Sequence, residues 1–396
     1  MRRMTVPEEL TALLGDLVTI PSVNPAMASP GASGTGEAGV AAHIVEWCRR
    51  HGLPARLREV SAGRPNVVVD LGLVRSETFL LQSHMDTVPG EPMGRRAYQP
   101  EVRDGRLYGR GACDAKGQLA AMLWAMLRLK GDGEQLLKAN AVFVAAVDEE
   151  HTFTGALAMV EDGLRAGGAI VGEPTGLQAV IAHKGVVRWG VTIEGRAAHT
   201  SRPQEGVNAI DAMQEALRAL RASWSQDRAT AAHPLLGYPT ATVVGIEGGV
   251  APNVVPDRCR ATFDYRLLPG QSAQEVLARV DAVLEQARLR GPGWTVRRES
   301  AFVCDGAMET PPEARITRAA LRAVREVTGR ETPPIGVPYG TDASKLSGAG
   351  GIPCVVLGAG DIAQAHTADE YVPLSEVAQA AEIYYHAARF FGENGQ

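Results

Sequence analysis

The sequence is poor in cysteine and has no long apolar run, and each shortage excludes a class of protein. Its five cysteines form no CxxC pair, which argues against a disulfide framework and against a cysteine-rich structural zinc site. No run of about 18 apolar residues occurs, so no membrane span is expected. No apolar segment follows the two arginines of MRRMTVPEEL, which argues against an export signal. We therefore expect a cytoplasmic protein without a membrane partner.

Basic residues are not concentrated either. The densest groups, such as Arg49-Arg50 and Arg297-Arg298, are only pairs, too short to follow a nucleic-acid backbone, so no nucleic-acid partner is expected. The sequence also lacks a G-x-S-x-G nucleophile elbow and a Walker loop. Gly34, Gly36 and Gly39 match G-x-G-x-x-G, but a proline-rich loop precedes them instead of a strand. Because a dinucleotide-binding glycine motif must follow a strand, these glycines do not indicate such a site.

The order of apolar segments predicts two domains, for which 396 residues give ample length. Short apolar runs at 66–71, 78–82 and 141–147, with a helical pattern at 119–127, predict an α/β domain. Its sheet is expected to be mainly parallel, with helices on both faces.

From about residue 185 the pattern changes to strand, helix, two strands, helix and strand. The clean alternation over 259–267 marks one of those strands. This βαββαβ order predicts an inserted ferredoxin-like lid or dimerisation domain at 185–298. The catalytic domain would then be discontinuous, covering 1–184 and 299–396.

Carboxylates and imidazoles recur at the ends of the predicted strands, where open α/β sheets bind ligands. They are His84 and Asp86 in LLQSHMDTVPG, Asp114 in GRGACDAKG, Glu149 and Glu150 in AAVDEEHTFTG, Glu173 in VGEP and His366 in QAHTADEY. Singly each has an ordinary interpretation, such as a helix N-cap for Asp114 or a solvated acidic turn for the DEE triplet. Together they form an imidazole and carboxylate set that suits Zn, Co or Mn in a catalytic site.

The spacing of two pairs of these residues indicates different roles for the members of each pair. His84 and Asp86 lie two apart and project to the same side of a strand, so one can bind metal while the other orients it. Glu149 and Glu150 are adjacent and point to opposite sides, so one can bind metal while the other carries a proton.

The ordered motifs resemble those of the metallopeptidase and deacylase family that includes acetylornithine deacetylase, succinyl-diaminopimelate desuccinylase, aminoacylase and the glutamate-releasing carboxypeptidases. They extend over essentially the whole chain: SHMDTVP, GRGACDAKG, DEEHTFTG, GEPTGL followed by AHKG, GRAAHTSRP, APNVVP, DYRLLPG and QAHTADEY. The resemblance implies a two-metal hydrolase of linear amide bonds that works in amino-acid biosynthesis. Its metals would be Zn, with Co or Mn as alternatives.

The resemblance also implies a metal-ligand set. Asp114 would bridge the two divalent ions, His84 and Glu173 would complete the ligands of one ion, and Glu150 and His366 those of the other. Asp86 would orient His84, Glu149 would be the general base, and the bond Asp114–Ala115 would be cis.

Further implied residues lie outside this set. His199 would reach across a homodimer into the partner subunit's site, Asn253 and Arg266 would bind the substrate carboxylate, and Gly340 and Thr341 would lie near the substrate. Without the resemblance, His199 would be an ordinary surface histidine at a strand end. Arg266 would be a solvated residue on the polar face of its strand.

The expected function is removal of the acyl group from a small N-acyl amino acid. GEPTGL followed by AHKG, together with QAHTADEY, resembles the acetylornithine deacetylase branch most, which implies N-acetylornithine as the first substrate. YGTDASKL at 339–346 instead resembles less characterised deacylases of the group. The alternatives are a metallo-exopeptidase or dipeptidase and a succinyl-diaminopimelate desuccinylase, although Glu173 in place of Asp favours a deacylase. A non-catalytic scaffold is disfavoured, because a scaffold needs no base such as Glu149.

Overall fold

The computed structural model describes residues 6–29, 34–133, 135–230, 232–291 and 293–393, whose strands form two large sheets and one small one. The chain folds as two units. The first comprises Met1–Ile181, Glu309–Ile335 and Thr341–Gln396, and the second comprises Ala182–Met308 and Gly336–Gly340. None of the described helices has the length and apolar character needed to cross a bilayer.

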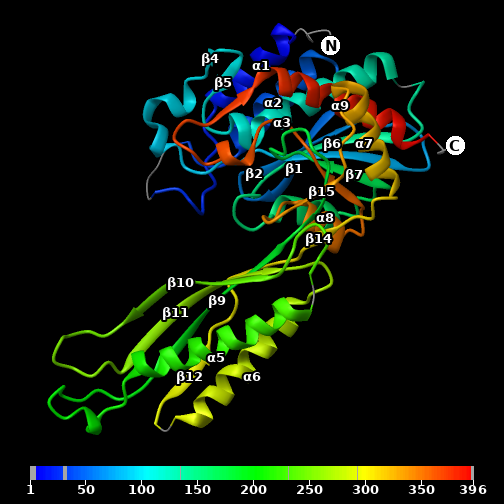
Figure 1. The fold of residues 1–396 in the computed structure, drawn as a ribbon. Coiled ribbons are helices and arrows are strands. Elements are labelled where there is room, and N and C mark those ends of the chain that lie inside the picture. Colours follow the sequence, from blue (N-terminus) through cyan, green and yellow to red (C-terminus); the bar gives the residue numbers. More distant parts are fainter. Residues whose placement is uncertain (1–5, 30–33, 134, 231, 292, 394–396) are drawn as a thin grey trace. The chain divides into compact units, whose positions relative to one another are not determined.

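A nine-stranded sheet is the framework of the first unit (Figure 1). Its order is β1 (Ala55–Ser61), β2 (Arg64–Asp70), β6 (Asn140–Ala146), β3 (Thr78–His84), β7 (Gly168–Val171), β16 (Cys354–Val356), β8 (Val180–His183) and β14 (Met308–Glu309), with β15 (Ile335–Val337) beside β8. The four strands β6, β3, β7 and β16 are parallel, whereas β1, β2 and β8 join antiparallel. Burial on both faces explains the continuous apolar runs of the parallel strands.

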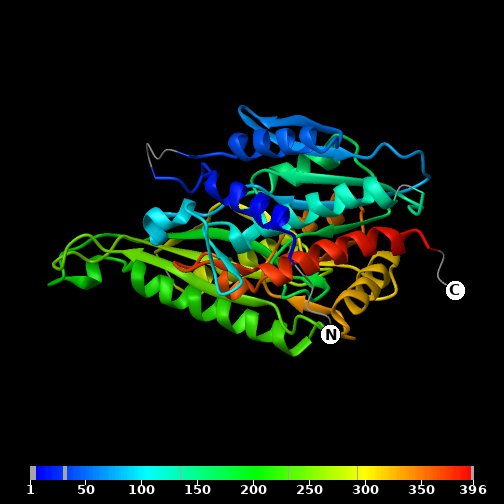
Figure 2. The same cartoon turned by 90° about the horizontal axis from the view of Figure 1, so that it is seen from above.

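Helices cover both faces of this sheet, as the sequence predicted. On one face lie α1 (Glu8–Thr19), α2 (Ala38–Arg50), α3 (Gly117–Arg128), α7 (Arg315–Thr328) and α9 (Leu374–Phe391). In Figure 2 the red helix α9 runs beside the orange helix α7, its neighbour in this layer. On the other face, α4 (Thr154–Glu161) packs against α8 (Ala343–Gly348) and β1.

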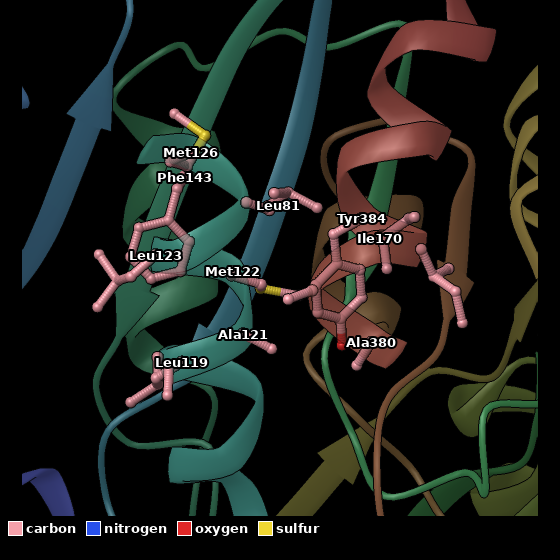
Figure 3. Packing of buried hydrophobic residues seen from close by; sticks show 14 of the residues in the cluster. Leu81, Leu119, Ala121, Met122, Leu123, Met126, Phe143, Ile170, Ala380 and Tyr384 are labelled. Atoms are coloured by element: carbon pink, nitrogen blue, oxygen red, sulfur yellow. The ribbon is translucent and has the colours of Figure 1, made fainter. Parts of the chain in front are cut away.

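The main core forms where α3 and α9 pack on the parallel strands (Figure 3). Leu119, Met122, Leu123 and Met126 recur at helical spacing along α3 and are all fully buried, as the sequence pattern predicted. Figure 3 shows them with Leu81 and Phe143 from the strands and Tyr384 from α9. Each large apolar side chain buried here stabilises the fold by about 1.5–3 kcal/mol, so this packing holds α3 firmly on the sheet.

A small three-stranded sheet joins two distant segments of the first unit. It contains β4 (Glu101–Arg103), β5 (Arg106–Tyr108) and β17 (Tyr371–Pro373), with β5 in the middle. Tyr371 pairs antiparallel with Tyr108, and their rings lie 5.2 Å apart. The loop that precedes α3 is thereby tied to the segment that follows His366.

The second unit has the predicted βαββαβ order. Its elements are β9 (Gly185–Glu194), α5 (Ala209–Thr230), β10 (Thr240–Gly248), β11 (Arg258–Leu267), α6 (Ala273–Arg290) and β12 (Thr295–Arg298), followed by β13 (Val303–Asp305). The antiparallel sheet has the order β10-β11-β9-β12, with β13 also on β9. Side chains from β9 and β11 fill its core, where Trp189 and Phe263 stack at 5.4 Å. Ser272 Oγ accepts the backbone N–H of Glu275 and so caps the first turn of α6.

Candidate active site

The predicted metal-binding side chains of the first unit gather at one edge of its sheet. Strands β6, β3, β7 and β16 are parallel, so their carboxyl ends share that edge. His84 is the last residue of β3, and Glu149 and Glu150 follow β6. Glu173 follows β7, and His366 lies in the loop after β16.

Two groups of potential ligands result, and Asp114 lies beside both histidines. His84 Nε2 is 3.0 Å from Asp114 Oδ1 and 3.9 Å from Glu173 Oε1. His366 Nε2 is 3.2 Å from Asp114 Oδ2 and 3.1 Å from Glu150 Oε1. The ligand atoms of His84, Glu149 and Glu173 lie within 4.8 Å of one another, and so do those of Asp114, Glu150 and His366. The two carboxylate oxygens of Asp114 thus face one histidine each.

The electrostatics of this cluster fit bound cations. Burial, with the Glu173 carboxylate next in importance, raises the pKa of Glu149 well above its ordinary value. Burial likewise raises the pKa of Glu173, whose buried Oε1 has no hydrogen-bond partner among the described residues. Four carboxylates so close together repel one another, and two divalent cations would balance their charge. The oxygen and imidazole donors suit zinc, cobalt or manganese.

A short irregular segment presents Asp114 to both histidines. Gly111 has φ 81°, a left-handed conformation that glycine adopts without steric cost. The bond Asp114–Ala115 is cis, which confirms what the sequence resemblance implied. The segment then enters α3, whose buried side chains fix it against the sheet.

Asp86 supports the cluster mainly through backbone groups. His84 Nδ1 lies 2.9 Å from the Asp86 carbonyl oxygen and 3.5 Å from Asp86 Oδ1. The two Asp86 carboxylate oxygens accept the backbone N–H groups of Glu149 and Glu150, each at 3.1 Å. The side chain that the sequence suggested for orienting His84 therefore also holds the turn that carries the two glutamates.

A buried polar network supports this turn, and no sequence motif predicted it. Asn24 Nδ2 donates to Asp86 Oδ2 at 2.7 Å and to Asp148 Oδ1 at 3.0 Å. Arg64 donates to Asp148 at 3.1 Å and to both carboxylate oxygens of Glu37. Asn24 lies in the proline-rich loop, and no periodic pattern marks it. Its position before Pro25 was the sole local signal of an ordered turn.

The remaining predicted residues lie mostly in the second unit. Exposed His199 and Asn253 are neighbours, because Thr200 N–H donates to the Asn253 carbonyl at 3.1 Å. His199 Nδ1 lies 2.8 Å from Ser201 Oγ. Arg266, near the end of β11, donates through Nε to Asp264 Oδ1 at 2.8 Å.

The pair Gly340–Thr341 spans the boundary between the units. Gly340 belongs to the second unit and Thr341 to the first. Thr341 is buried, and its Oγ1 accepts the backbone N–H of Ala343 at 3.2 Å. Its side chain therefore supports the start of α8.

Comparison with protein families gives a match over most of the chain. The model described as "Peptidase family M20/M25/M40" matches residues 80–389. An acetylornithine deacetylase from Myxococcus xanthus is 36% identical over 319 residues, covering 78% of this chain and 79% of the relative. One from Pectobacterium carotovorum is 34% identical over 311 residues, covering 77% and 78%.

Solved structures share the fold along nearly the full length. An M20 family metallo-carboxypeptidase from Sulfolobus solfataricus matches with a TM-score of 0.77 at 20% identity, covering 98% of this chain and 100% of that one. The aminopeptidase PepT from Bacillus cereus matches with a TM-score of 0.78 at 23% identity, covering 98% and 99%. A Bacillus subtilis protein described as a dinuclear metal-binding peptidase matches with a TM-score of 0.72 at 15% identity, covering 96% and 97%.

Proposed function

This chain belongs to peptidase family M20/M25/M40 and is a metal-dependent hydrolase of amide bonds, and from that premise we propose that it removes the acyl group from a small N-acyl amino acid. N-acetylornithine is the first candidate, because curated relatives with at least 34% identity are named acetylornithine deacetylase. The main structural support for a hydrolytic metal site is that His84 and His366 each lie beside a different carboxylate oxygen of Asp114.

The residues at the sheet edge would hold two divalent ions, with zinc first and cobalt or manganese as alternatives. Asp114 would bridge them, with His84 and Glu173 on one ion and Glu150 and His366 on the other. When bound, such a metal pair supplies Lewis acidity that polarises a carbonyl and lowers the pKa of water. This assignment uses every potential ligand of the cluster except Glu149, which is left free for proton transfer.

Glu149 would act as the general base. Its backbone is fixed by Asp86, and its carboxylate lies in the same group as His84 and Glu173. The attacking water would lose a proton to the Glu149 carboxylate as its oxygen bonds to the amide carbon. The same proton would pass to the departing nitrogen when the carbon–nitrogen bond breaks. Both transfers need one carboxylate that does not bind metal.

Residues of the second unit, together with Thr341, would bind the substrate. The Arg266 guanidinium and the Asn253 amide would hold the α-carboxylate, because a guanidinium fork matches a carboxylate. The Arg266 guanidinium already donates to the Asp264 carboxylate, so the substrate carboxylate would compete with Asp264 for it. The backbone at Gly340 and Thr341 would line the substrate, and exposed His199 would donate to the oxyanion that develops on the carbonyl oxygen.

A homodimer would let His199 act in the partner subunit's site. The edge strand β10 supports such an assembly, because one of its sides pairs with β11 and no described strand pairs with the other. Val244 and Ile246 on this strand are each 57% exposed, and an exposed apolar edge favours strand-to-strand pairing. Sedimentation should show a dimer, with V244K/I246K as the monomeric variant. A monomeric wild-type protein with full activity would contradict the dimer proposal.

The cytoplasm is the proposed compartment. Five cysteines, all within the described chain, are free thiols, and four of them are buried. Unpaired thiols are typical of proteins in a reducing compartment.

The second candidate is a metallo-exopeptidase or dipeptidase, which would use the same metals and base. The fold is shared with a carboxypeptidase and an aminopeptidase, so the fold cannot separate it from a deacylase. The test compares kcat/KM of the zinc- or cobalt-loaded protein for N-acetylornithine, succinyl-diaminopimelate, N-acetylmethionine and dipeptides. We expect N-acetylornithine to rank first. A value no better than for N-acetylmethionine or a dipeptide would contradict the narrow assignment and leave the amidohydrolase standing.

A further inference from the structure

A completely buried ion pair lies directly behind the segment that carries Asp114. The side chains of Arg110 and Glu370 are each 1% exposed, and Arg110 Nη1 donates to Glu370 Oε2 at 2.6 Å. Burying two charges costs several kcal/mol of desolvation, which their attraction recovers only with good geometry and further hydrogen bonds. The second carboxylate oxygen of Glu370, Oε1, supplies such hydrogen bonds.

That oxygen binds the backbone on which the proposed bridging carboxylate stands. Glu370 Oε1 accepts the N–H of Cys113 at 3.0 Å and the N–H of Asp114 at 3.1 Å. Two charge-assisted hydrogen bonds on consecutive peptide groups fix the orientation of that backbone. The Asp114 side chain leaves the main chain at this point, so its direction is set there as well.

The pair itself is held in place by several other contacts. Arg110 Nε donates to the Pro89 carbonyl at 3.1 Å, and Arg110 N–H donates to the Ala97 carbonyl at 2.8 Å. The Glu370 carbonyl accepts the N–H of Gly109 at 3.1 Å, and the next residue begins β17 in the small sheet. The Pro89 contact holds the Arg110 guanidinium, and the other two bonds fix the main chain from which the two side chains extend.

Glu370 also connects the two segments that approach Asp114. It lies four residues after His366, whose Nε2 is 3.2 Å from Asp114 Oδ2. One side chain thus fixes the backbone of Asp114 from the segment that supplies His366. A movement of the segment from His366 to Glu370 would therefore displace His366 and the backbone of Asp114 together.

We propose that Arg110 and Glu370 are positioning residues that aim the Asp114 carboxylate between His84 and His366 and so set the affinity for the metal pair. The inference rests on the proposed metal-binding function. Arg110 fixes the Glu370 carboxylate and neutralises it, and Glu370 fixes the peptide groups of Cys113 and Asp114. Neither side chain needs to contact substrate.

The direct test is Glu370→Gln with the affinity for Zn²⁺ or Co²⁺ measured by competition with a chelator. The amide oxygen can still accept backbone N–H groups, but its NH₂ faces Arg110 Nη1, so donor opposes donor. Loss of a partner that orients a metal ligand typically costs 10–100-fold in metal affinity, and we expect a loss in that range. The absorption spectrum of the Co²⁺-loaded variant should change. Its kcat should fall, whereas its KM should change less, because neither residue contacts the substrate.

The matched control is Glu382→Gln. Glu382 also pairs with an arginine, Arg128, and the two residues lie on the helices α9 and α3. This variant loses a glutamate–arginine pair that does not touch Asp114. Its metal affinity and Co²⁺ spectrum should equal those of the wild type.

The double variant Arg110→Met/Glu370→Gln separates positioning from stability. Removing both charges leaves no unpaired buried ion, so the metal-free double variant should melt closer to the wild type than Glu370→Gln does. Its metal affinity should stay at least tenfold below the wild type, because the neutral amide binds the two N–H groups more weakly. If Glu370→Gln does not fold, the metal affinity of the double variant alone tests the positioning role.

Two outcomes would overturn the inference, and a third would overturn its premise. Wild-type metal affinity in Glu370→Gln would contradict it. So would recovery of metal affinity in step with thermal stability in the double variant, because the pair would then be purely structural. If the wild-type protein itself binds no metal pair, the proposed function fails first.

Discussion

The two units place their proposed functional residues in opposite surroundings. His84, Asp114 and Glu173 are at most 7% exposed and lie where parallel strands end. His199 and Asn253, in the second unit, are exposed on neighbouring segments outside its strands. Buried ligands held by backbone contacts keep the fixed geometry that a metal requires, whereas exposed polar groups can adapt to a substrate. The difference predicts that substitutions in the first unit change metal binding, and that those in the second change substrate binding or turnover and leave metal binding unchanged.

Glu149 is the exception within the first unit, and its removal should have the largest effect that spares the metals. We expect Glu149→Ala to lower kcat by about 10²–10⁴-fold, the usual contribution of a general base, and to retain both metal ions. Steady-state kinetics and metal analysis on the same sample measure this. The control is Glu161→Ala, which changes an exposed glutamate at the end of α4. If metal content fell while the rate per bound metal held, Glu149 would be a ligand.

His199→Ala tests the second unit. Loss of one oxyanion donor should lower kcat by roughly 10²–10³-fold. Because the side chain is exposed, stability should change by less than about 0.5 kcal/mol, and metal affinity should not change. A loss of metal affinity would break the division between the units.

Mixed dimers decide whether His199 acts across the subunits. A dimer of one His199→Ala and one Glu149→Ala subunit retains one site with both groups only if His199 acts in trans. We expect such heterodimers to be far more active than either homodimer. Activity equal to the average of the two homodimers would instead place both groups in one subunit.

Arg266→Lys should give the smallest effect. A lysine cannot form the two parallel hydrogen bonds of a guanidinium, so KM for the N-acyl amino acid should rise roughly tenfold, the equivalent of losing one charge-assisted hydrogen bond. The control is Arg258→Lys at the exposed start of the same strand. An unchanged KM would show that Arg266 serves Asp264 and not the substrate.

The sequence predicts most of the framework because its signals are periodic. The apolar runs at 78–82 and 141–147 predict the parallel strands β3 and β6, whereas the run at 66–71 is β2, which pairs antiparallel. Alternation over 259–267 predicts β11, and the ends of the predicted strands point to His84 and Glu173. The outer strand β1 has neither signal, because its side chains are largely exposed and do not alternate in burial.

The supporting contacts could not be predicted, because they join residues far apart in the chain. Glu370 lies 256 residues from the Asp114 N–H that it accepts, and Asn24 lies 124 residues from Asp148. Neither contact belongs to a periodic pattern of a helix or a strand, so the sequence contains no pattern that predicts it. Most of the proposed metal ligands follow the ends of strands, where a sequence pattern can point to them, whereas the residues that support them are recognised only in the folded structure.

Metal titration tests whether the cluster around Asp114 is a catalytic metal site. Protein stripped by a chelator is reloaded with measured equivalents of Zn²⁺ or Co²⁺, and the release of acetate from N-acetylornithine is followed at each point. The ligand set His84, Asp114, Glu150, Glu173 and His366 predicts no turnover without metal and full activity at two bound equivalents. Full turnover by rigorously metal-free protein would contradict the account.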